Sequence, residues 1–582
     1  MRRPIVWALL FLLPALLGAC SSCGSPEGPS PSASAKAVEL APVPAPAGLL
    51  AELYVEKPGA TWSRVRKLVG GPARLLPAGF QMLAATLLGL PPEAAGLIDD
   101  LPVRGAMVLD DQGSPRVVVG LHVRAAKEVI ASLTTGSKAR FHASHDKKSG
   151  VTLLDPVEGK ASSDVALGVV GHYLLAAKAP AVVKAAGPFV ARTLPTRKPP
   201  PGPIVAVIDH KALAGAVASR LSRGWKAYKK QLEQSSRKTQ QKQGHPADFA
   251  DPAAALMGAS SAVGGAVDVL RSSERLVVVL DPMQARLAAR AELTPGKKGA
   301  AADLVAGMTV GSLDALTRLP GSTALALASH TDDKSRQAWA DSTTTALEKL
   351  LGKRLTGADR KKLEQTLSDL AKGRGDNAAI GVAVGEQASV LLRSSVADAD
   401  AFQSGARGLF QLLRVPAIVR PVQQFLGKTT VVLSKAHVKG IDGIVQRAKV
   451  TVAPPKDKQK VPGIRLGSKP IDFLWTVQHG VALGAAAHEP EPGLLGLVQA
   501  AGNASSSLGG EASVAAAVKR LGHDAAFALF IDPKALSAAG PAHGARAPVL
   551  LGFGRTQGRG WLKADVSQAA IQAVIRVTMM RR

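Results

Sequence analysis

The residues that could do chemistry in this chain stand in a few short stretches, and none completes a catalytic or metal-binding pattern. His142 and His145 precede Asp146, and all three residue types bind metal ions. Positions three apart on a strand face opposite sides, however, and no second cluster supplies the remaining ligands of a closed site. Ser235 and Lys238 have the Ser-x-x-Lys spacing, but they lie in a polar segment without the buried surroundings that activate a lysine. The sequence therefore predicts no catalytic residue, no metal site and no cofactor.

A basic amphipathic stretch is the most distinctive feature of the body of the chain. Leu221, Trp225, Tyr228 and Leu232 follow one another at helical spacing and would form one apolar stripe. Basic residues flank this stripe, so a helix here could lie in an anionic interface. The candidate contacts with an anionic surface are Arg220, Arg223, Trp225, Lys226, Tyr228, Lys229 and Lys230. Alternatively, the stripe packs on the protein's own core. The polar segment from Gln234 to His245 is predicted to be a mobile loop.

The N-terminal stretch predicts export and lipid attachment. Two arginines precede an apolar run from Ile5 to Leu17, which has the length of a secretory signal region and is too short to span a bilayer. Leu17-Gly18-Ala19-Cys20 then resembles the lipobox of bacterial lipoproteins. The resemblance implies that the peptide is cut before Cys20, that the Cys20 thiol is diacylated, and that the new amine is usually acylated. Because Ser21 rather than Asp follows the cysteine, it also implies the outer membrane. Cys23 is an incidental residue, a second acylation site or an intermolecular bridge.

Composition limits the partners. The chain has 582 residues, a formal net charge of +28 and only 4% aromatic residues. An exported basic protein meets anionic lipid or cell-wall polymer rather than nucleic acid, and no run interleaves basic residues with stacking rings. We therefore expect attachment to the membrane through the N-terminal lipid, a contact with anionic lipid, polymer or a protein partner, and no nucleic acid. The charge could also serve solubility alone.

Self-similarity divides the chain into two repeats. Ile208-Asp-His-Lys-Ala-Leu is echoed by Ile531-Asp-Pro-Lys-Ala-Leu, and the order of expected elements recurs after about 273 residues. The predicted organisation is a signal peptide over 1–19 and a lipidated, disordered tether over 20–47. A first repeat over 48–308 then carries a basic insertion near 214–270, and a second over 313–582 carries an insertion near 411–470. The Asp of the repeated motif is expected to cap the turn or helix that follows it.

The expected elements indicate an α+β protein. Strands are predicted over 49–55 and 323–329, hairpins over 105–123 and 378–396, and helices over 63–76, 80–90, 125–133, 337–351, 359–370 and 399–410. Hairpins that alternate with helices predict an internally duplicated unit of mostly antiparallel sheet with helices packed on one face. Three kinds of function remain: a non-enzymatic binding or scaffolding module of the outer membrane, a carrier that holds an apolar or lipid-like ligand in a cavity, and an envelope enzyme.

Overall fold

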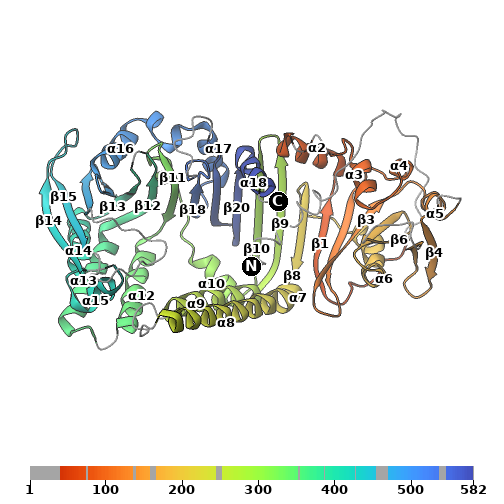
Figure 1. Ribbon diagram of the computed structural model, residues 1–582, viewed down its shortest axis with the longest axis horizontal. Helices are drawn as coiled ribbons and strands as arrows, with labels where there is room; N and C mark the ends of the chain where they lie inside the picture. Colours follow the sequence, from red (N-terminus) through yellow and green to blue (C-terminus); the bar gives the residue numbers. More distant parts are fainter. Residues whose placement is uncertain are drawn as a thin grey trace. The chain divides into compact units, whose positions relative to one another are not determined.

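The chain forms two compact units (Figure 1). The computed structural model describes residues 40–580 except 72, 74, 75, 136–138, 158–164, 244–251, 352, 353, 386, 427, 454–469 and 537–545. The first unit runs to Arg220 and includes Leu270–Gly296, and the second comprises Leu221–Val269 and Lys297–Arg582. The second unit thus begins before the expected boundary near residue 313. Helix α10 (Ala300–Gly307) belongs to it because Arg555 donates hydrogen bonds to the carbonyl oxygens of Val305 and Ala306 at 3.2 and 2.8 Å.

All strand pairs of the first unit are antiparallel. The central strand β1 (Leu49–Val55) lies between β2 (Val103–Leu109) and β8 (Ile204–Asp209). The remaining strands are β3 (Pro115–His122), β4 (Phe141–Asp146), β5 (Val151–Pro156), β6 (Ala166–Val170), β7 (Tyr173–Ala177), β9 (Ser273–Met283) and β10 (Arg286–Pro295). Within this unit the strand order is β10-β9-β8-β1-β2-β3-β7-β6-β5-β4.

The second unit has the same arrangement of antiparallel strands. Its central strand β11 (Thr323–His330) lies between β12 (Arg374–Ala383) and β18 (Ala525–Ile531). The others are β13 (Ser389–Val396), β14 (Lys428–Ala436), β15 (Val445–Ala453), β16 (Ile471–Gln478), β17 (Val481–Ala487), β19 (Val549–Thr556) and β20 (Arg559–Ser567). The order is β20-β19-β18-β11-β12-β13-β17-β16-β15-β14, which matches the first unit strand for strand.

An irregularity of pairing also occurs at the same place in both units. The register between β1 and β2 shifts between Leu49 and Ala51, and the register between β11 and β12 shifts between Thr323 and Leu325. Bulges of this kind are specific features of a sheet rather than random defects. The two motif strands β8 and β18 occupy equivalent positions, as expected. Asp209 caps the next turn as predicted, because its side chain accepts a hydrogen bond from the backbone N–H of Ala212 at 2.9 Å.

The helices follow the expected order, with shifted ends. The helix predicted over 63–76 is α2 (Pro58–Val69), because proline favours the first helical turn and Gly70 leaves the helix at a φ of 77°. The other helices of the first unit are α3 (Phe80–Leu87), α4 (Pro92–Ala95), α5 (Ala126–Thr134), α6 (Pro180–Pro188) and α7 (His210–Ala212). Those of the second unit are α11 (Asp314–Thr317), α12 (Asp333–Leu351), α13 (Gly357–Gly373), α14 (Ala399–Leu412), α15 (Pro416–Leu426), α16 (Glu491–Gly502), α17 (Ala512–Leu521) and α18 (Gln568–Met580).

Helices contact both faces of the sheet, so the expectation of a single covered face is not confirmed. In β7, Leu174 packs with α5 in one core cluster, whereas the next residue, Leu175, packs with α6 in another. Successive strand residues point to opposite faces. Continuous apolar runs such as the one in β7 are typical of strands that are buried on both sides, so the sequence does contain a signal for two covered faces.

The end of the predicted tether is ordered against the first unit. Leu40 and Val43 pack on a core cluster of this unit. The backbone of Val43 also exchanges two hydrogen bonds with the hydroxyl of Thr193, at 2.9 and 2.7 Å. The expectation of disorder is therefore wrong for residues 40–47, because two apolar side chains find a partner surface. Cys20 and Cys23 lie outside the described residues.

Candidate functional site

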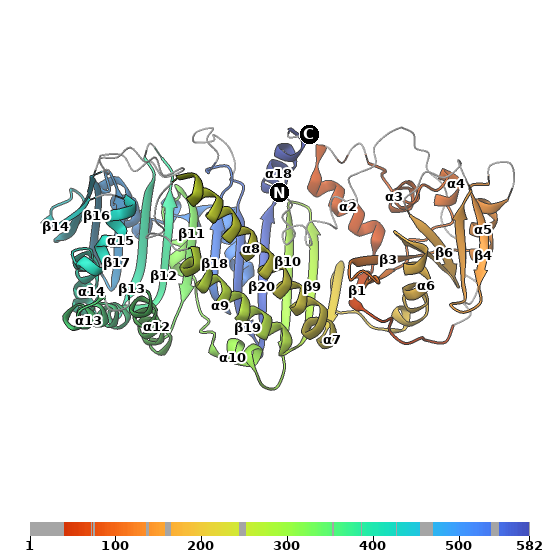
Figure 2. The same ribbon diagram turned by 60° about the horizontal axis from the view of Figure 1, so that its bottom comes forward.

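The residues predicted to contact an anionic surface lie on helix α8 (Ala218–Gln243). Figure 2 shows α8 beside α9 (Pro252–Arg271) as a helical hairpin, and the indole N–H of Trp225 donates to the hydroxyl of Ser260 at 3.2 Å. Trp225 is half-buried, whereas Tyr228 keeps 52% of its surface exposed with its ring 5.8 Å from that of Trp225. The apolar stripe therefore packs partly on α9.

The five basic residues among the predicted contacts are mostly free of acidic partners within the described chain. Lys229 approaches Glu233 at 3.9 Å, and Arg220 donates to the carbonyl oxygen of Gly113 at 3.2 Å. The remaining three, Arg223, Lys226 and Lys230, are exposed. Contact with an anionic surface remains a prediction. The expected mobile loop is wrong for residues 234–243, which continue α8, because Gln, Lys and Arg are good helix formers even without an apolar face.

Sequence reasoning missed a pocket in the second unit that contains two arginines. The pocket measures about 220 Å³, and we call it the arginine pocket. It lies where α12 and α13 meet the end of β11, and its lining combines two cations with three hydroxyls and an indole. The lining residues are Ser329, Thr331, Ser335, Arg336, Trp339, Ala371 and Arg374.

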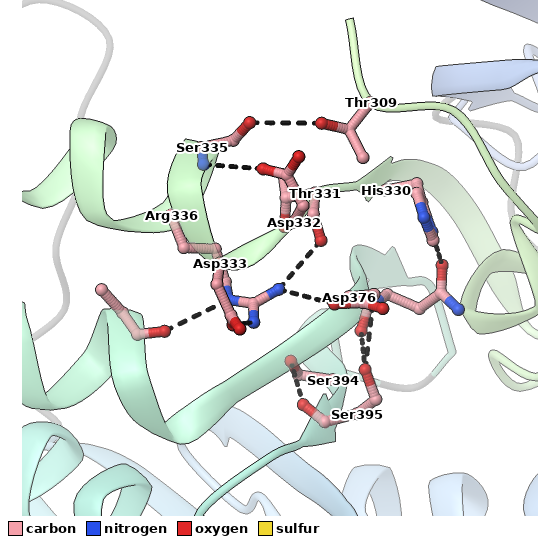
Figure 3. A network of polar contacts seen from close by, with 12 residues as sticks. Thr309, His330, Thr331, Asp332, Asp333, Ser335, Arg336, Asp376, Ser394 and Ser395 are labelled. Atoms are coloured by element: carbon pink, nitrogen blue, oxygen red, sulfur yellow. Dashed lines mark hydrogen bonds and ion pairs between the residues drawn. The ribbon is translucent and has the colours of Figure 1, made fainter.

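Arg336 is the structural arginine of this pocket. It is only 4% exposed, and Figure 3 shows its guanidinium at the centre of a polar network. It donates to the carbonyl oxygens of Ala371 and Thr331 at 3.2 and 2.8 Å and to the carboxylate of Asp376 at 2.8 Å, and it also pairs with Asp333. Its charge and hydrogen-bonding capacity are therefore satisfied within the protein, and it joins α12, α13 and β12.

Arg374 is different, because no described residue forms a hydrogen bond or ion pair with its guanidinium. Burial lowers the pKa of Arg374, and the nearby charge of Arg336 lowers it further. The hydroxyl of Thr331, which lines the same pocket, is buried without a hydrogen-bond partner. Buried polar groups normally find partners, so an unpaired cation beside an unpaired hydroxyl is suited to an anionic ligand.

Apolar side chains cover the neighbouring face of the second unit's sheet, which we call the apolar face. One cross-strand row runs through five strands from β13 to β19 and consists of Leu392, Ile380, Leu327, Leu529 and Leu551. The next row runs from β13 to β20 and consists of Val390, Val382, Leu325, Ile531, Val549 and Val566. All these positions lie on one side of the sheet, because they alternate with core residues along each strand.

Part of this face is open to solvent. The exposed fractions of Leu327, Ile380 and Val390 are 39, 45 and 43%, and Leu562 on β20 is 49% exposed. Helix α14 covers the same face farther along, where it packs on β16 and β17 through Phe402 and Trp475. Contiguous exposed apolar patches on a folded protein mark sites that bind ligands, partners or membranes. The opposite face is covered by the core that contains α16 and α17.

Two other places contain charged or titratable side chains that could bind a ligand or act in catalysis, but neither forms a complete site. A pocket of about 620 Å³ lies between α11, α16 and α17, and its rim carries Arg318, Lys519 and His523 beside small residues. In the first unit, the imidazole of His122 lies 2.9 Å from the carboxylate of Asp99 and stacks on His172. Among the described contacts, none joins this carboxylate–imidazole pair to a hydroxyl or thiol that it could activate as a nucleophile.

The remaining observations concern metals, membranes and relatives. Among the described residues, no group of three or more His, Cys, Asp or Glu side chains is placed to hold a metal ion. In the same part of the chain, no helix is both long and apolar enough to cross a bilayer. Comparisons with models of protein families, with curated proteins and with solved structures find no match, so function has to be argued from this chain's own residues.

Proposed function

We propose that the chain is a lipid-anchored protein of the bacterial cell envelope, tethered to the outer membrane, that binds a ligand rather than catalysing a reaction. The N-terminal signal and Cys20 support the location through their resemblance to bacterial lipoproteins. The observation that supports the binding function is the exposed apolar face of the second unit. Exposing Leu327 and Ile380 to water costs free energy, and a ligand bound to this face would recover it.

The ligand is apolar or lipid-like in this proposal. The two pockets described above open at the surface of the second unit, and the larger one has a mixed charged lining rather than an apolar one. Binding on an open sheet face therefore has more support than binding in an enclosed cavity. Scaffolding of a protein partner would use the same surface, and the following experiment separates the two.

The test recovers mature wild-type protein from its own envelope and analyses what copurifies by mass spectrometry, beside a variant with Leu327→Gln and Ile380→Gln. We expect lipid with the wild type and a several-fold loss with the variant, because an exposed apolar contact on binding is worth on the order of 1 kcal/mol per side chain. A protein partner lost from the variant, with no lipid, would show scaffolding instead. Equal recovery from both proteins would contradict binding by this face.

We also propose that the two units arose by internal duplication. The common order of the strands, the bulge at the start of β1 and of β11, and the equivalent positions of β8 and β18 support it. The insertions then distinguish the copies. Helices α8 and α9 separate β8 from β9 in the first copy, whereas α15 is added before β14 in the second, where β14 and β15 themselves correspond to β4 and β5. Distinct functions tend to arise in such additions.

Replacing the lipidated cysteine tests the proposed location. We expect Cys20→Ala to block both cleavage and lipid attachment, because the thiol accepts the diacylglycerol before the peptide is cut in the proteins that this signal resembles. The measurement is the intact mass and the membrane fraction of the protein in bacterial cells. Cys23→Ala is the matched control, which we expect to be processed normally. A wild-type protein that is recovered without lipid from the soluble fraction would contradict the proposal.

A further inference from the structure

The arginine pocket adjoins the apolar face through a residue that they share. Ser329 lines the pocket, and on β11 it follows Leu327 by two positions, so its side chain points to the same side of the sheet. Its neighbours across β18 and β19 are Phe527 and Phe553, and the row ends at the exposed Leu562. The pocket that contains Arg374 therefore continues, through Ser329, into a surface of aliphatic and aromatic side chains.

Arg374 is the charged group at this pocket that lacks a partner of opposite charge among the described residues. The carboxylates of Asp333 and Asp376 both pair with Arg336, and Asp332 accepts a hydrogen bond from the backbone N–H of Ser335 at 2.7 Å. Each nearby acid thus has a partner already. Arg374 has none among the described residues, and a carboxylate or phosphate accepts two parallel hydrogen bonds from a guanidinium.

The first unit shows that an arginine is not required here by the fold. Arg374 pairs with Val396 at the start of β12, and the matching bridge in the first unit pairs Ile98 with Val123. Ile98 is 2% exposed in an apolar core cluster. A partly buried cation in place of an isoleucine is costly unless a partner compensates its charge, so its presence in the second unit calls for a function.

The apolar face has the dimensions of a long alkyl chain. Its rows cross up to six strands, which lie about 4.8 Å apart, so the face extends for about 24 Å. Trp339 stands at the rim of the pocket with 44% of its surface exposed. Indole rings favour such boundaries, where one side is apolar and the other polar.

We propose that the second unit binds an anionic lipid, with its head group held by Arg374 in the arginine pocket and its alkyl chain along the apolar face. This inference rests on the proposed function, because it assigns the chemical class of ligand to the same surface. Arg374 supplies the charged contact, and the hydroxyls of Thr331 and Ser329, which line the same pocket, can donate to the remaining oxygens of the head group.

Three probe molecules distinguish the contribution of the head group to binding from that of the alkyl chain. The protein is the whole chain from residue 20 onward, with Cys20→Ala so that it carries no lipid of its own. Palmitate below its micellar concentration offers both parts, hexadecanol offers the chain without the charge, and acetate offers the carboxylate alone. Calorimetric titration should show palmitate binding about tenfold more tightly than hexadecanol, and no heat from acetate, since one charge-assisted contact typically accounts for a factor of this size.

Variants then assign the contacts. Arg374→Gln should weaken palmitate binding about tenfold and leave hexadecanol unchanged. Arg393→Gln is the matched control, because Arg393 is a buried arginine of the same sheet with an unpaired nitrogen, but it points to the opposite face. It should leave palmitate binding unchanged. Thermal melting of each variant confirms that it folds.

Two results would overturn the inference, and they are distinguishable. In the first, Arg374→Gln binds palmitate as tightly as the wild type, while Ile380→Gln weakens the binding of both palmitate and hexadecanol. The apolar face then binds lipid without a charged subsite, and only the inference fails. If neither palmitate nor hexadecanol binds, or if Leu327→Gln and Ile380→Gln change nothing, the proposed function fails with it.

Discussion

Replacing Gly405 by alanine should destabilise the second unit by about 2–3 kcal/mol, although alanine is intrinsically the better helix former. Gly405 lies in α14 where this helix crosses α13, and a Cβ atom there would stand 2.7 Å from both the backbone nitrogen and the side chain of Leu370. Backbone cannot move aside as a flexible side chain can, so the two helices would have to separate. Thermal or urea unfolding measures the loss.

The control for this prediction is Gly224 in the exposed part of α8. Nothing lies within 4 Å of a Cβ atom built there, so Gly224→Ala should raise stability by up to about 1 kcal/mol through helix propensity alone. The same substitution thus has opposite signs at two helical positions. If Gly405→Ala were neutral or stabilising, the close crossing of α13 and α14 would be wrong.

The two arginines of the pocket should respond in opposite directions to the same change. We expect Arg336→Met to cost about 3 kcal/mol, because it leaves the carbonyl oxygens of Thr331 and Ala371 without their donor and separates α12 from β12. Arg374→Met should instead raise stability by about 1 kcal/mol, since it removes a partly buried cation with no described partner.

Urea unfolding of both variants measures the contrast. A residue kept for ligand binding commonly lowers stability, whereas a residue kept for structure raises it. A loss of similar size from both substitutions would show that Arg374 is structural too, and it would remove the stability argument for a ligand. Arg393→Met extends the comparison to a second buried arginine with an unpaired nitrogen, where a gain is also expected.

The strands and hairpins were the most predictable part of the fold. Short apolar runs with turn signals between them predicted β1 at Leu49–Val55 and the hairpin of β2 and β3 within a few residues. These features are local, so a short window of sequence contains them. The faces covered by helices were not predicted correctly, because burial on both sides depends on which distant helix reaches each face.

The arginine pocket could not be predicted because its parts are far apart in sequence and look ordinary one by one. Arg336 lay just outside the helix expected to begin at residue 337, whereas α12 begins at Asp333. Its spacing of four from the buried Ala340 places it on the inner side of that helix, and this was the available signal. Arg374 stands between two glycines and resembles a surface turn. Only the packing of α12 on α13 brings the two arginines together.

The pairing of β1 with both β2 and β8 sets the order in which each unit can fold. Leu53 pairs with Gly105 on one side but with Ala206 on the other, about 150 residues later, and Leu325 of the second unit pairs with Ile531. β1 and β11 are the first strands of their units to be synthesised. Their edges that pair with β8 and β18 stay unpaired until most of the unit has been synthesised. Such an edge invites pairing with other chains. Each unit therefore has an open sheet edge until its β8 or β18 is synthesised and pairs, so its folding is more exposed to wrong pairing than its finished structure is.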